Sequence, residues 1–499
     1  MNDREKSDSV VVPAKRPNKA RVAARDAEVV EGRTLAEGNS WGAYTRRTQC
    51  RESVKSGLAR VREAAQKDRK QRFTALYHHV YEVDALRMAY WALNRKAAAG
   101  VDGVTWKSYG EELEKNLQDL SVRLKRGAYR ARPVRRVHIK KSSGGQRPLG
   151  ILMLEDKLVQ RATTTVMNAI YEVDFLGFSY GFRPGRSQHM ALDALAGGLR
   201  EKGVRWVLDA DIRGFFDALD HEWMVNFVKH RIGDQRIIRL LKKWLKAGVL
   251  EGEEYMKAEK GAIQGGSISP LLGNIYLHYV FDLWSHQWRK RHARGSVTIV
   301  RYADDIVVGF EHQSDARRFL VELRTRFAEF ALELHPDKTR LLEFGHFALT
   351  NRQRRGVGKP ETFEFLGLTH ICGRSRRGYS QIVRKTSPVR FRRKLKDIKH
   401  VLRRTPGWSI PSMGMYLASV VRGHAAYYGV PGNSRRLASF RYEVAKLWKR
   451  ALERRSERTR VRWDRMSRLI ARWLPPTRVC HPYPEVRFRA TTQGRSPVR

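Results

Sequence analysis

Four carboxylates stand where two apolar segments of this chain end or turn. Asp209 and Asp211 close the segment 204–211. Asp304 and Asp305 lie further along, between two runs of β-branched residues. Residues two apart in a strand share one face, so Asp209 and Asp211 are expected to point the same way. Adjacent carboxylates between apolar strands are costly unless a cation neutralises them, so the pattern predicts a cation nearby.

These residue types are suited to phosphoryl chemistry. Carboxylate oxygens are the ligands that hard divalent cations prefer. Two such ions about 3.5–4 Å apart align an attacking hydroxyl with a phosphate and stabilise the leaving pyrophosphate. We therefore expect Asp211 and Asp304 to meet and to hold Mg²⁺. The competing interpretation is that Asp304 and Asp305 are ordinary turn residues and that one of Asp209 and Asp211 caps a helix.

The charge of the chain favours a polyanionic partner. The 499 residues include 98 Lys+Arg against 51 Asp+Glu, a formal net charge of +47. Self-repulsion of that size would oppose compaction of a protein working alone. Residues 371–499 hold 33 Lys+Arg against 6 Asp+Glu, a net of +27. Nucleic acid is the expected partner rather than a membrane surface.

Cysteine usage and hydropathy exclude several classes of protein. Cys50, Cys372 and Cys480 lie far apart, so neither a zinc site of the usual spacing nor a disulfide framework is expected. The first residues lack the apolar core of a signal peptide. No run of about 18 apolar residues occurs, so a transmembrane helix is not expected. These features predict a cytoplasmic protein, associated with the nucleoid or with RNA.

Helical and strand patterns alternate along the chain and must position the carboxylates. Residues 1 to about 70 form a polar extension, with a helical pattern from Arg51 to Arg72. Strand patterns occupy the glycine-tipped hairpin 129–151, the two carboxylate-bearing segments, and 363–368. Non-contiguous strands among helices predict an α+β fold with an antiparallel sheet.

Eight motifs then occur in one order between about residue 90 and residue 430: AGVDG at 99–103, RPLGI at 147–151, SYGFRPGRS at 179–187, ADIRGFFDALDH at 210–221, QGGSISPLLGNIYL at 264–277, YADD at 302–305, Lys338-Thr339 and FLG at 365–367. With these eight motifs in this order, the chain resembles the reverse transcriptases encoded within bacterial group II introns, which are also called intron maturases.

The resemblance implies a right-hand polymerase with fingers, palm and thumb. The expected parts are an N-terminal extension at 1–72, fingers at 73–200, a palm at 201–375, a thumb or maturase domain at 376–440, and a basic DNA- or RNA-binding tail at 441–499. Many relatives carry a zinc-containing HNH nuclease beyond this point, and its paired cysteines are missing here. We therefore expect no endonuclease domain.

The resemblance also assigns the catalytic centre. Asp211, Asp304 and Asp305 correspond to the family's catalytic triad, and the metal site comprises these residues and Ile212. Two Mg²⁺ ions are implied, with Asp211 and Asp304 as ligands to both. Asp209, Asp217 and Asp220 are expected to have structural roles, through helix caps and hydrogen bonds.

A nucleotide pocket follows from the same resemblance. Phe216 lies where the family places a ring beneath the incoming sugar, which favours dNTPs over NTPs; the alternative is a core aromatic. Arg147 and Lys140 flank the fingers hairpin tip and are expected near the triphosphate, although the choice between Lys140 and Lys141 stays open. Gln264 is expected to line the pocket, although isoleucine precedes it where the family usually has proline. Lys338 is expected near the triphosphate or at the surface.

Four arginines are expected to contact nucleic acid. Arg183 and Arg186 belong to the GFRPGR loop, Arg393 to a basic helix, and Arg422 to the thumb signature. His424 stands in that signature where the family usually has tryptophan, so different packing is expected there. In the tail, the expected DNA-binding residues are Arg454, Arg455, Arg458, Arg460, Arg462 and Arg465.

The sequence thus predicts an RNA-directed DNA polymerase that copies intron RNA and assists its splicing. Its partners would be the intron RNA template, a DNA primer or target, and dNTPs. The alternatives are a splicing-only RNA-binding maturase and a relative adapted to defence or diversification. The sequence leaves the oligomeric state open.

Overall fold

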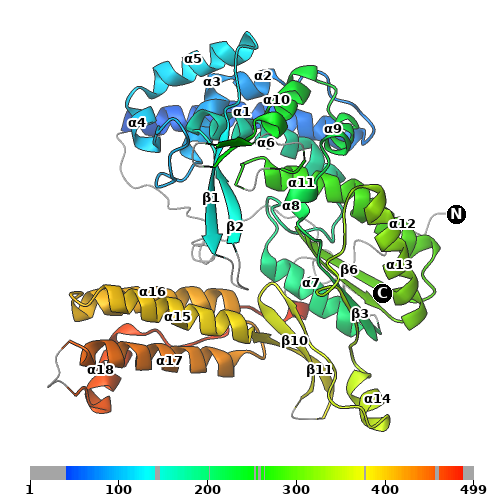
Figure 1. Cartoon of the computed structure of the whole chain (residues 1–499), viewed down its shortest axis with the longest axis vertical. Coiled ribbons are helices and arrows are strands. Elements are labelled where there is room, and N and C mark those ends of the chain that lie inside the picture. Colours follow the sequence, from blue (N-terminus) through cyan, green and yellow to red (C-terminus); the bar gives the residue numbers. More distant parts are fainter. Residues whose placement is uncertain are drawn as a thin grey trace.

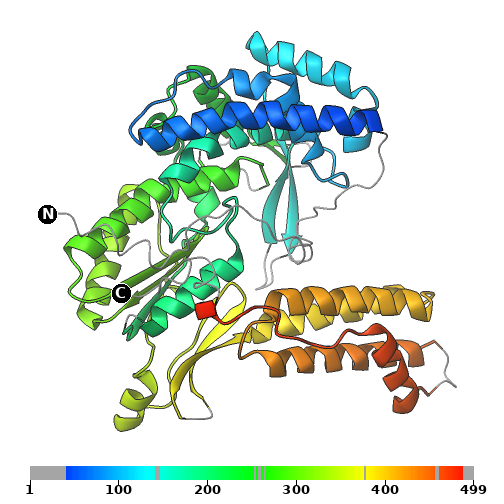
Figure 2. The same cartoon turned by 180° about the vertical axis from the view of Figure 1, so that it is seen from behind.

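The structure is a computed structural model that describes residues 41–140, 146–201, 203–251, 254–256, 260–262, 265–375, 378–455 and 460–486. A helical region lies at one end of the molecule, a sheet with flanking helices lies in the middle, and an elongated helical bundle extends to one side (Figures 1 and 2). We call these three regions fingers, palm and thumb. The fingers region includes residues 221–256, which were expected in the palm, and the palm includes residues 188–201, which were expected in the fingers.

The fingers region consists of helices above a small sheet. Its first helix, α1 (Trp41–Lys67), packs against α6 (Leu154–Asp174) and buries Val54 and Ala65. The helical pattern predicted for 51–72 is therefore confirmed in the main, but α1 belongs to the fingers core and not to a loose extension. The remaining helices are α2 (His78–Tyr81), α3 (Val83–Trp91), α4 (Trp106–Glu111), α5 (Leu113–Lys125), α9 (His221–Lys229) and α10 (Gln235–Lys246).

The sheet of the fingers carries the predicted glycine-tipped hairpin. Strand β1 (Val134–Lys140) pairs antiparallel with β2 (Gln146–Ile151), and the short strands β4 (Val249–Glu251) and β5 (Glu254–Met256) extend the sheet in the order β2-β1-β4-β5. The hairpin points from the fingers toward the thumb (Figure 1). Its tip, residues 141–145, lies outside the described residues.

The palm is an antiparallel sheet in the order β6-β7-β3-β8. Strands β6 (Val297–Tyr302) and β7 (Asp305–Phe310) form a hairpin that is buried along nearly its whole length. The other strands are β3 (Trp206–Ala210) and β8 (Arg340–Glu343), and the helices are α7 (Gln188–Glu201), α8 (Phe215–Ala218), α11 (Ser269–Leu277), the π-helical turn η2 (His278–Asp282), α12 (Leu283–Arg291) and α13 (Gln313–Glu329). The predicted α+β architecture with an antiparallel sheet is confirmed.

A second antiparallel sheet connects the palm to the thumb. It contains β9 (Phe363–Phe365), β10 (Leu368–Arg374) and β11 (Ser380–Thr386), with α14 (Ala348–Arg354) beside it. Tyr427 of the thumb donates a hydrogen bond from its hydroxyl to the Leu366 carbonyl in the β9–β10 turn, at 2.9 Å. The thumb is thereby fixed to the palm beside this turn.

The thumb has a hydrophobic core of its own and extends further than predicted. It contains α15 (Pro388–Arg404), α16 (Ile410–Tyr428), α17 (Ser434–Glu453) and α18 (Trp463–Trp473). Trp448, Met466 and Leu474 are buried in this core. The boundary predicted at residue 440 is therefore wrong, because the apolar faces of α17 and α18 complete the bundle.

The segment after α18 returns to the palm. Cys480 donates its backbone N–H to the Gly429 carbonyl at 2.8 Å, and the His481 ring stacks on His189 of α7 with centroids 3.6 Å apart. No helix in the described part of the chain is long and apolar enough to cross a bilayer.

Candidate active site

The turn of the palm hairpin carries the YADD motif. Tyr302 pairs with Asp305, so Ala303 and Asp304 form a two-residue connection between β6 and β7. Ala303 has a φ of +58°, in the left-handed region that costs a residue with a Cβ free energy. This strained turn presents Asp304 and Asp305 at the end of the sheet.

Strand β3 brings Asp211 to the same place. The register pairs Ala210 with Ile306 of β7, so the next position along β3, Asp211, comes opposite Asp305. The backbone carbonyl of Asp211 accepts a hydrogen bond from the His335 N–H at 2.8 Å, which fixes the end of the strand. The predicted meeting of the two carboxylate-bearing strand ends is therefore present in the fold.

The electrostatics reflect this clustering. The pKa of Asp305 is raised to about 7, chiefly because protein atoms crowd out water around its carboxyl group, although the side chain reaches the surface. Neighbouring negative charges on Asp304, Asp211 and Asp209 add to the rise. Carboxylates that raise one another's pKa in this way form an oxygen-rich site suited to a hard divalent cation.

Asp209 and Asp220 have structural partners. Burial raises the pKa of Asp209 to about 6, and Arg340 opposes the rise from 3.3 Å away. Asp220 caps α9 by accepting the backbone N–H groups of Glu222 and Trp223. Both contacts agree with the structural roles expected for these two residues.

Lys338 lies directly at the carboxylate cluster. Its Nζ is 2.7 Å from Asp211 Oδ2, and 61% of its side chain is exposed. The ammonium group therefore partly neutralises the cluster. Lys338 is thus an exposed residue, as one of the two sequence-based alternatives held, and its ammonium also lies against one of the carboxylates; its position near a triphosphate stays a prediction.

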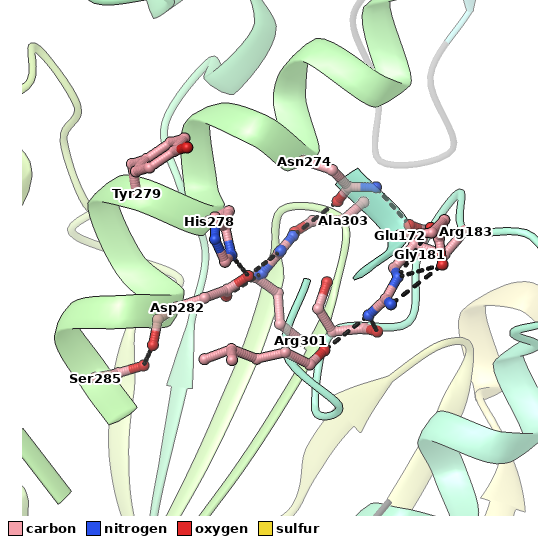
Figure 3. A network of polar contacts seen from close by, with 12 residues as sticks. Glu172, Gly181, Arg183, Asn274, His278, Tyr279, Asp282, Ser285, Arg301 and Ala303 are labelled. Carbon is pink, nitrogen blue, oxygen red and sulfur yellow. Dashed lines mark hydrogen bonds and ion pairs between the residues drawn. The ribbon is translucent and has the colours of Figure 1, made fainter. Parts of the chain in front are cut away.

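A buried polar network supports the turn from behind (Figure 3). Arg301, at the end of β6, is fully buried and pairs with Asp282 of η2 through two contacts of 2.6 and 2.7 Å. Its Nη1 donates to the Ala303 carbonyl and to Asn274 Oδ1, each at 2.9 Å. The guanidinium thus holds the carbonyl of the strained turn residue. Sequence reasoning missed Arg301, although an arginine inside an apolar strand beside the motif was a usable signal.

The segment before α7 also supports the turn. Asn274 donates to the Gly181 carbonyl at 2.8 Å, and Tyr180 donates its backbone N–H to the Arg301 carbonyl at 2.9 Å. A Cβ on Gly181 would lie 2.3 Å from the Ala303 nitrogen, so only glycine permits this approach. The SYGF segment is therefore packed against the catalytic turn.

The expectation that Arg183 contacts nucleic acid is corrected by its surroundings. Arg183 is 5% exposed and bonds to both carboxylate oxygens of Glu172 and to the carbonyls of Leu176 and Ser179. A guanidinium engaged in this way holds the loop and has no face to offer a phosphate. The sequence could not distinguish this role from a surface contact.

The other predicted contact residues differ in exposure. Arg186 is half-buried over the Tyr180 ring, 5.4 Å from its centroid, and its Nε and Nη1 have no hydrogen-bond partner among the described residues. Arg393 on α15 and Arg422 on α16 are exposed. His424 is buried and stacks on Phe440, with ring centroids 3.6 Å apart.

The loop before α11 contacts both α8 and the fingers sheet. Phe216 on α8 is partly buried, and its carbonyl accepts the Ala262 N–H at 2.7 Å. A Cβ on Gly265 would lie 2.4 Å from the Gly150 carbonyl of β2, so Gly265 approaches the fingers strand closely. Gly261 and Ala262 thus lie beside α8, and Gly265 lies beside β2.

Three of the expected pocket residues can be placed only in part. Lys140 and Arg147 occupy β1 and β2, where Lys140 pairs with Gln146 and Arg147 pairs with Ile139. Gln264 lies outside the described residues, as does Lys141. Ile212, the fourth member of the expected metal site, has a buried hydrocarbon side chain with no donor atom, so only its backbone oxygen can serve as a ligand.

Three regions arranged as a hand, with a strained palm hairpin that presents clustered carboxylates, define the class of template-dependent nucleic-acid polymerases. Within that class, residues 139–370 match the reverse transcriptase (RNA-dependent DNA polymerase) family. The group II intron-encoded protein LtrA of Lactococcus lactis subsp. cremoris is 39% identical over 223 residues, which cover 44% of this chain and 37% of LtrA. Protein YkfC of Escherichia coli is 37% identical over 297 residues, which cover 52% of this chain and 77% of YkfC.

The chain belongs to the reverse transcriptase family, in its group II intron-encoded branch, and has the right-hand polymerase fold of that family. The matched region spans little more than a third of the length of LtrA. Among solved structures, a telomerase from Candida albicans in complex with a fragment of telomeric RNA aligns over 70% of this chain and 63% of that chain. The two structures have a TM-score of 0.39 and 11% sequence identity.

Proposed function

We propose that this protein is an RNA-directed DNA polymerase that copies intron RNA into DNA. The observation that carries the proposal is the clustering of Asp211, Asp304 and Asp305 at the end of the palm sheet, seen in the register of β3 with β7 and in the raised pKa of Asp305. The reaction would be attack of a primer 3′-hydroxyl on the α-phosphate of a dNTP, with release of pyrophosphate.

The donor set fits two Mg²⁺ ions. Asp211 and Asp304 would hold both, with Asp305 and the Ile212 carbonyl completing the site, because hard cations bind oxygen. When bound, the ions lower the pKa of the attacking hydroxyl and stabilise charge on the leaving phosphates. The contact of Lys338 with Asp211 supports the fit, since a cation already compensates the cluster there.

Protein side chains would orient the nucleotide. Lys338, Lys140 and Arg147 would neutralise the triphosphate, because cations beside transferring phosphates offset the charge that develops on them. Gln264 would line the pocket, and the Phe216 ring would lie beneath the sugar. A ring at that position leaves no room for a 2′-hydroxyl, so dNTPs would be preferred.

Primer extension tests the proposal. A labelled DNA primer on an RNA template is incubated with Mg²⁺ and either dNTPs or NTPs, using the wild type and the near-isosteric Asp304→Asn and Asp211→Asn variants. Extension with dNTPs by the wild type alone is expected. Absence of extension by every protein, with tight binding of structured RNA, would instead support a splicing-only maturase.

A second function, binding of the intron RNA and assistance to its splicing, is supported by different observations. The exposed face of α15 carries a run of cations that includes Arg392, Arg393, Lys394, Lys396 and Lys399. Like-charged exposed side chains on one helix suit a phosphate backbone. Splicing of the parent intron RNA with and without the protein, and with the Asp304→Asn variant, separates this activity from polymerisation. A relative adapted to defence would have no such intron RNA.

A further inference from the structure

Phe182 has a backbone conformation that is unusual for an aromatic residue. Its φ is +56°, in the left-handed region, where the Cβ clashes with the carbonyl oxygen that follows. Such strain persists only where the surrounding structure fixes it, and it concentrates at functional sites. The neighbouring residues must therefore impose this conformation on Phe182, and a function of the ring would account for its cost.

Both neighbours of Phe182 are held rigidly. On one side, Gly181 lies against Ala303, and its carbonyl accepts the Asn274 amide. On the other side, Arg183 is anchored in the buried ion pair with Glu172. The chain has no freedom to relax Phe182 without breaking one of these contacts, so the strain is imposed from both sides.

The strain does not serve to bury the ring. Phe182 is 50% exposed and is not among the residues packed on the hydrophobic core. No ring contact within the described part of the chain involves it. A large apolar side chain is thus held at the surface, at a cost, one residue from the glycine that contacts the catalytic turn.

The same loop carries a positive charge, that of Arg186, whose guanidinium lies over the Tyr180 ring. Arg186, four residues on, has a buried Nε and Nη1 that lack hydrogen-bond partners among the described residues. Aromatic rings that stack on bases and cations that attract phosphates are the combination with which proteins bind a single nucleic-acid strand, and this loop carries both residue types.

We propose that the Phe182 ring stacks on a base of the nucleic-acid strand that passes the catalytic turn. The inference rests on the proposed polymerase function, since it needs a primer–template at this site. The strained backbone then holds the ring in the stacking position before the nucleic acid binds.

The test uses the full chain and a fluorescent DNA primer annealed to RNA. Glycine adopts a positive φ without strain, so Phe182→Gly should keep or raise the melting temperature, by about 1–3 °C. The same variant should bind primer–template about 5- to 100-fold more weakly, because removing one base–aromatic stacking contact lowers affinity by that factor. Phe182→Tyr should bind within about twofold of the wild type, since it keeps the ring.

Controls separate this contact from general effects. Phe347→Leu removes another exposed aromatic ring, beside α14, and should leave the affinity unchanged. A further control places an abasic site at successive positions, first in the template and then in the primer. At one position the wild type and Phe182→Gly should bind with equal affinity, and that position identifies the base that the ring contacts.

Two results would overturn the inference. Wild-type affinity in Phe182→Gly would show that the ring makes no contact, and a large fall in its melting temperature would show that the ring is structural. Failure of the proposed function is distinguishable, because the wild type would then bind but not extend the primer.

Discussion

Arg301 and Asp282 form an ion pair in which neither side chain reaches solvent, with Nη2 2.6 Å from Oδ2. The same guanidinium holds the carbonyl of Ala303, so the pair connects the π-helical turn η2 to the strained catalytic turn (Figure 3). Short π-helical segments inside helices are frequent at functional sites. The position of the turn that carries Asp304 therefore depends on a residue that is itself fully buried.

Replacing Arg301 should impair the turn more than the fold. In Arg301→Lys the charge is kept, but the fork that contacts Asp282, Asn274 and Ala303 together is lost. We expect a fall in kcat for primer extension of at least about tenfold, with KM for primer–template nearly unchanged, since about 1.4 kcal/mol of positioning corresponds to tenfold. Arg326→Lys, at a more exposed pair with Glu329, is the matched control. Unchanged kcat in Arg301→Lys would contradict the positioning role.

Removing the ammonium of Lys338 should weaken nucleotide binding without weakening metal binding. In Lys338→Met, loss of a cation beside the triphosphate should raise KM for dNTP about tenfold. The Mg²⁺ concentration for half-maximal rate should stay the same or fall, because Asp211 no longer shares its charge with Lys338. Steady-state titrations of dNTP and Mg²⁺ measure both effects. A higher Mg²⁺ requirement would show that Lys338 supports the metals instead of compensating for them.

Shortening Phe216 should relax sugar selection. Its ring lies against Gly273 of α11, where an added Cβ would be 3.3 Å from Phe216 Cε1. Phe216→Val opens space beneath the sugar, so we expect incorporation of NTPs to rise about 10- to 100-fold relative to dNTPs, the range that one pocket contact supplies. Single-nucleotide extension with dCTP and CTP compares the two. Unchanged discrimination would assign Phe216 to the core, as the competing interpretation held.

The thumb should lose stability in mild acid through His424. Burial, and then Lys394, lower the pKa of His424 to about 3, so the folded state binds the proton more weakly than the unfolded state does. A depressed histidine pKa means that stability is complete above about pH 6.5 and falls as pH decreases toward 3. At pH 5 this residue alone should cost about 2 kcal/mol.

His424→Trp, the residue usual in the family, tests this dependence. The variant removes the titrating group while keeping a ring against Phe440. Thermal melts at pH 7.5 and pH 5 should show a smaller difference for the variant than for the wild type. Equal differences would assign the acid sensitivity to other buried histidines, such as His278 and His370.

The sequence predicted those features whose physical cause is local. Asp211 and YADD were found because carboxylates inside apolar strands have few uses, and the hairpin 129–151 because glycines mark its tip. The thumb boundary predicted at residue 440 is wrong because α17 and α18 carry many arginines as well as apolar faces. Those apolar faces form a core only when the two helices pack in the bundle. Arg183 and Arg301 were misassigned or missed because their acidic partners lie on other elements. Such pairings become visible only in three dimensions.

The most direct test of the catalytic cluster is single-turnover incorporation of one dNTP by the wild type and by Asp304→Asn. Both proteins are first saturated with the same DNA primer on an RNA template, and their affinities for it are measured separately. We predict equal affinity and at least about a 1000-fold slower chemical step in the variant, since a neutral amide replaces the charged carboxylate proposed to hold both metals. Equal rates in the two proteins would contradict an active site at Asp211, Asp304 and Asp305.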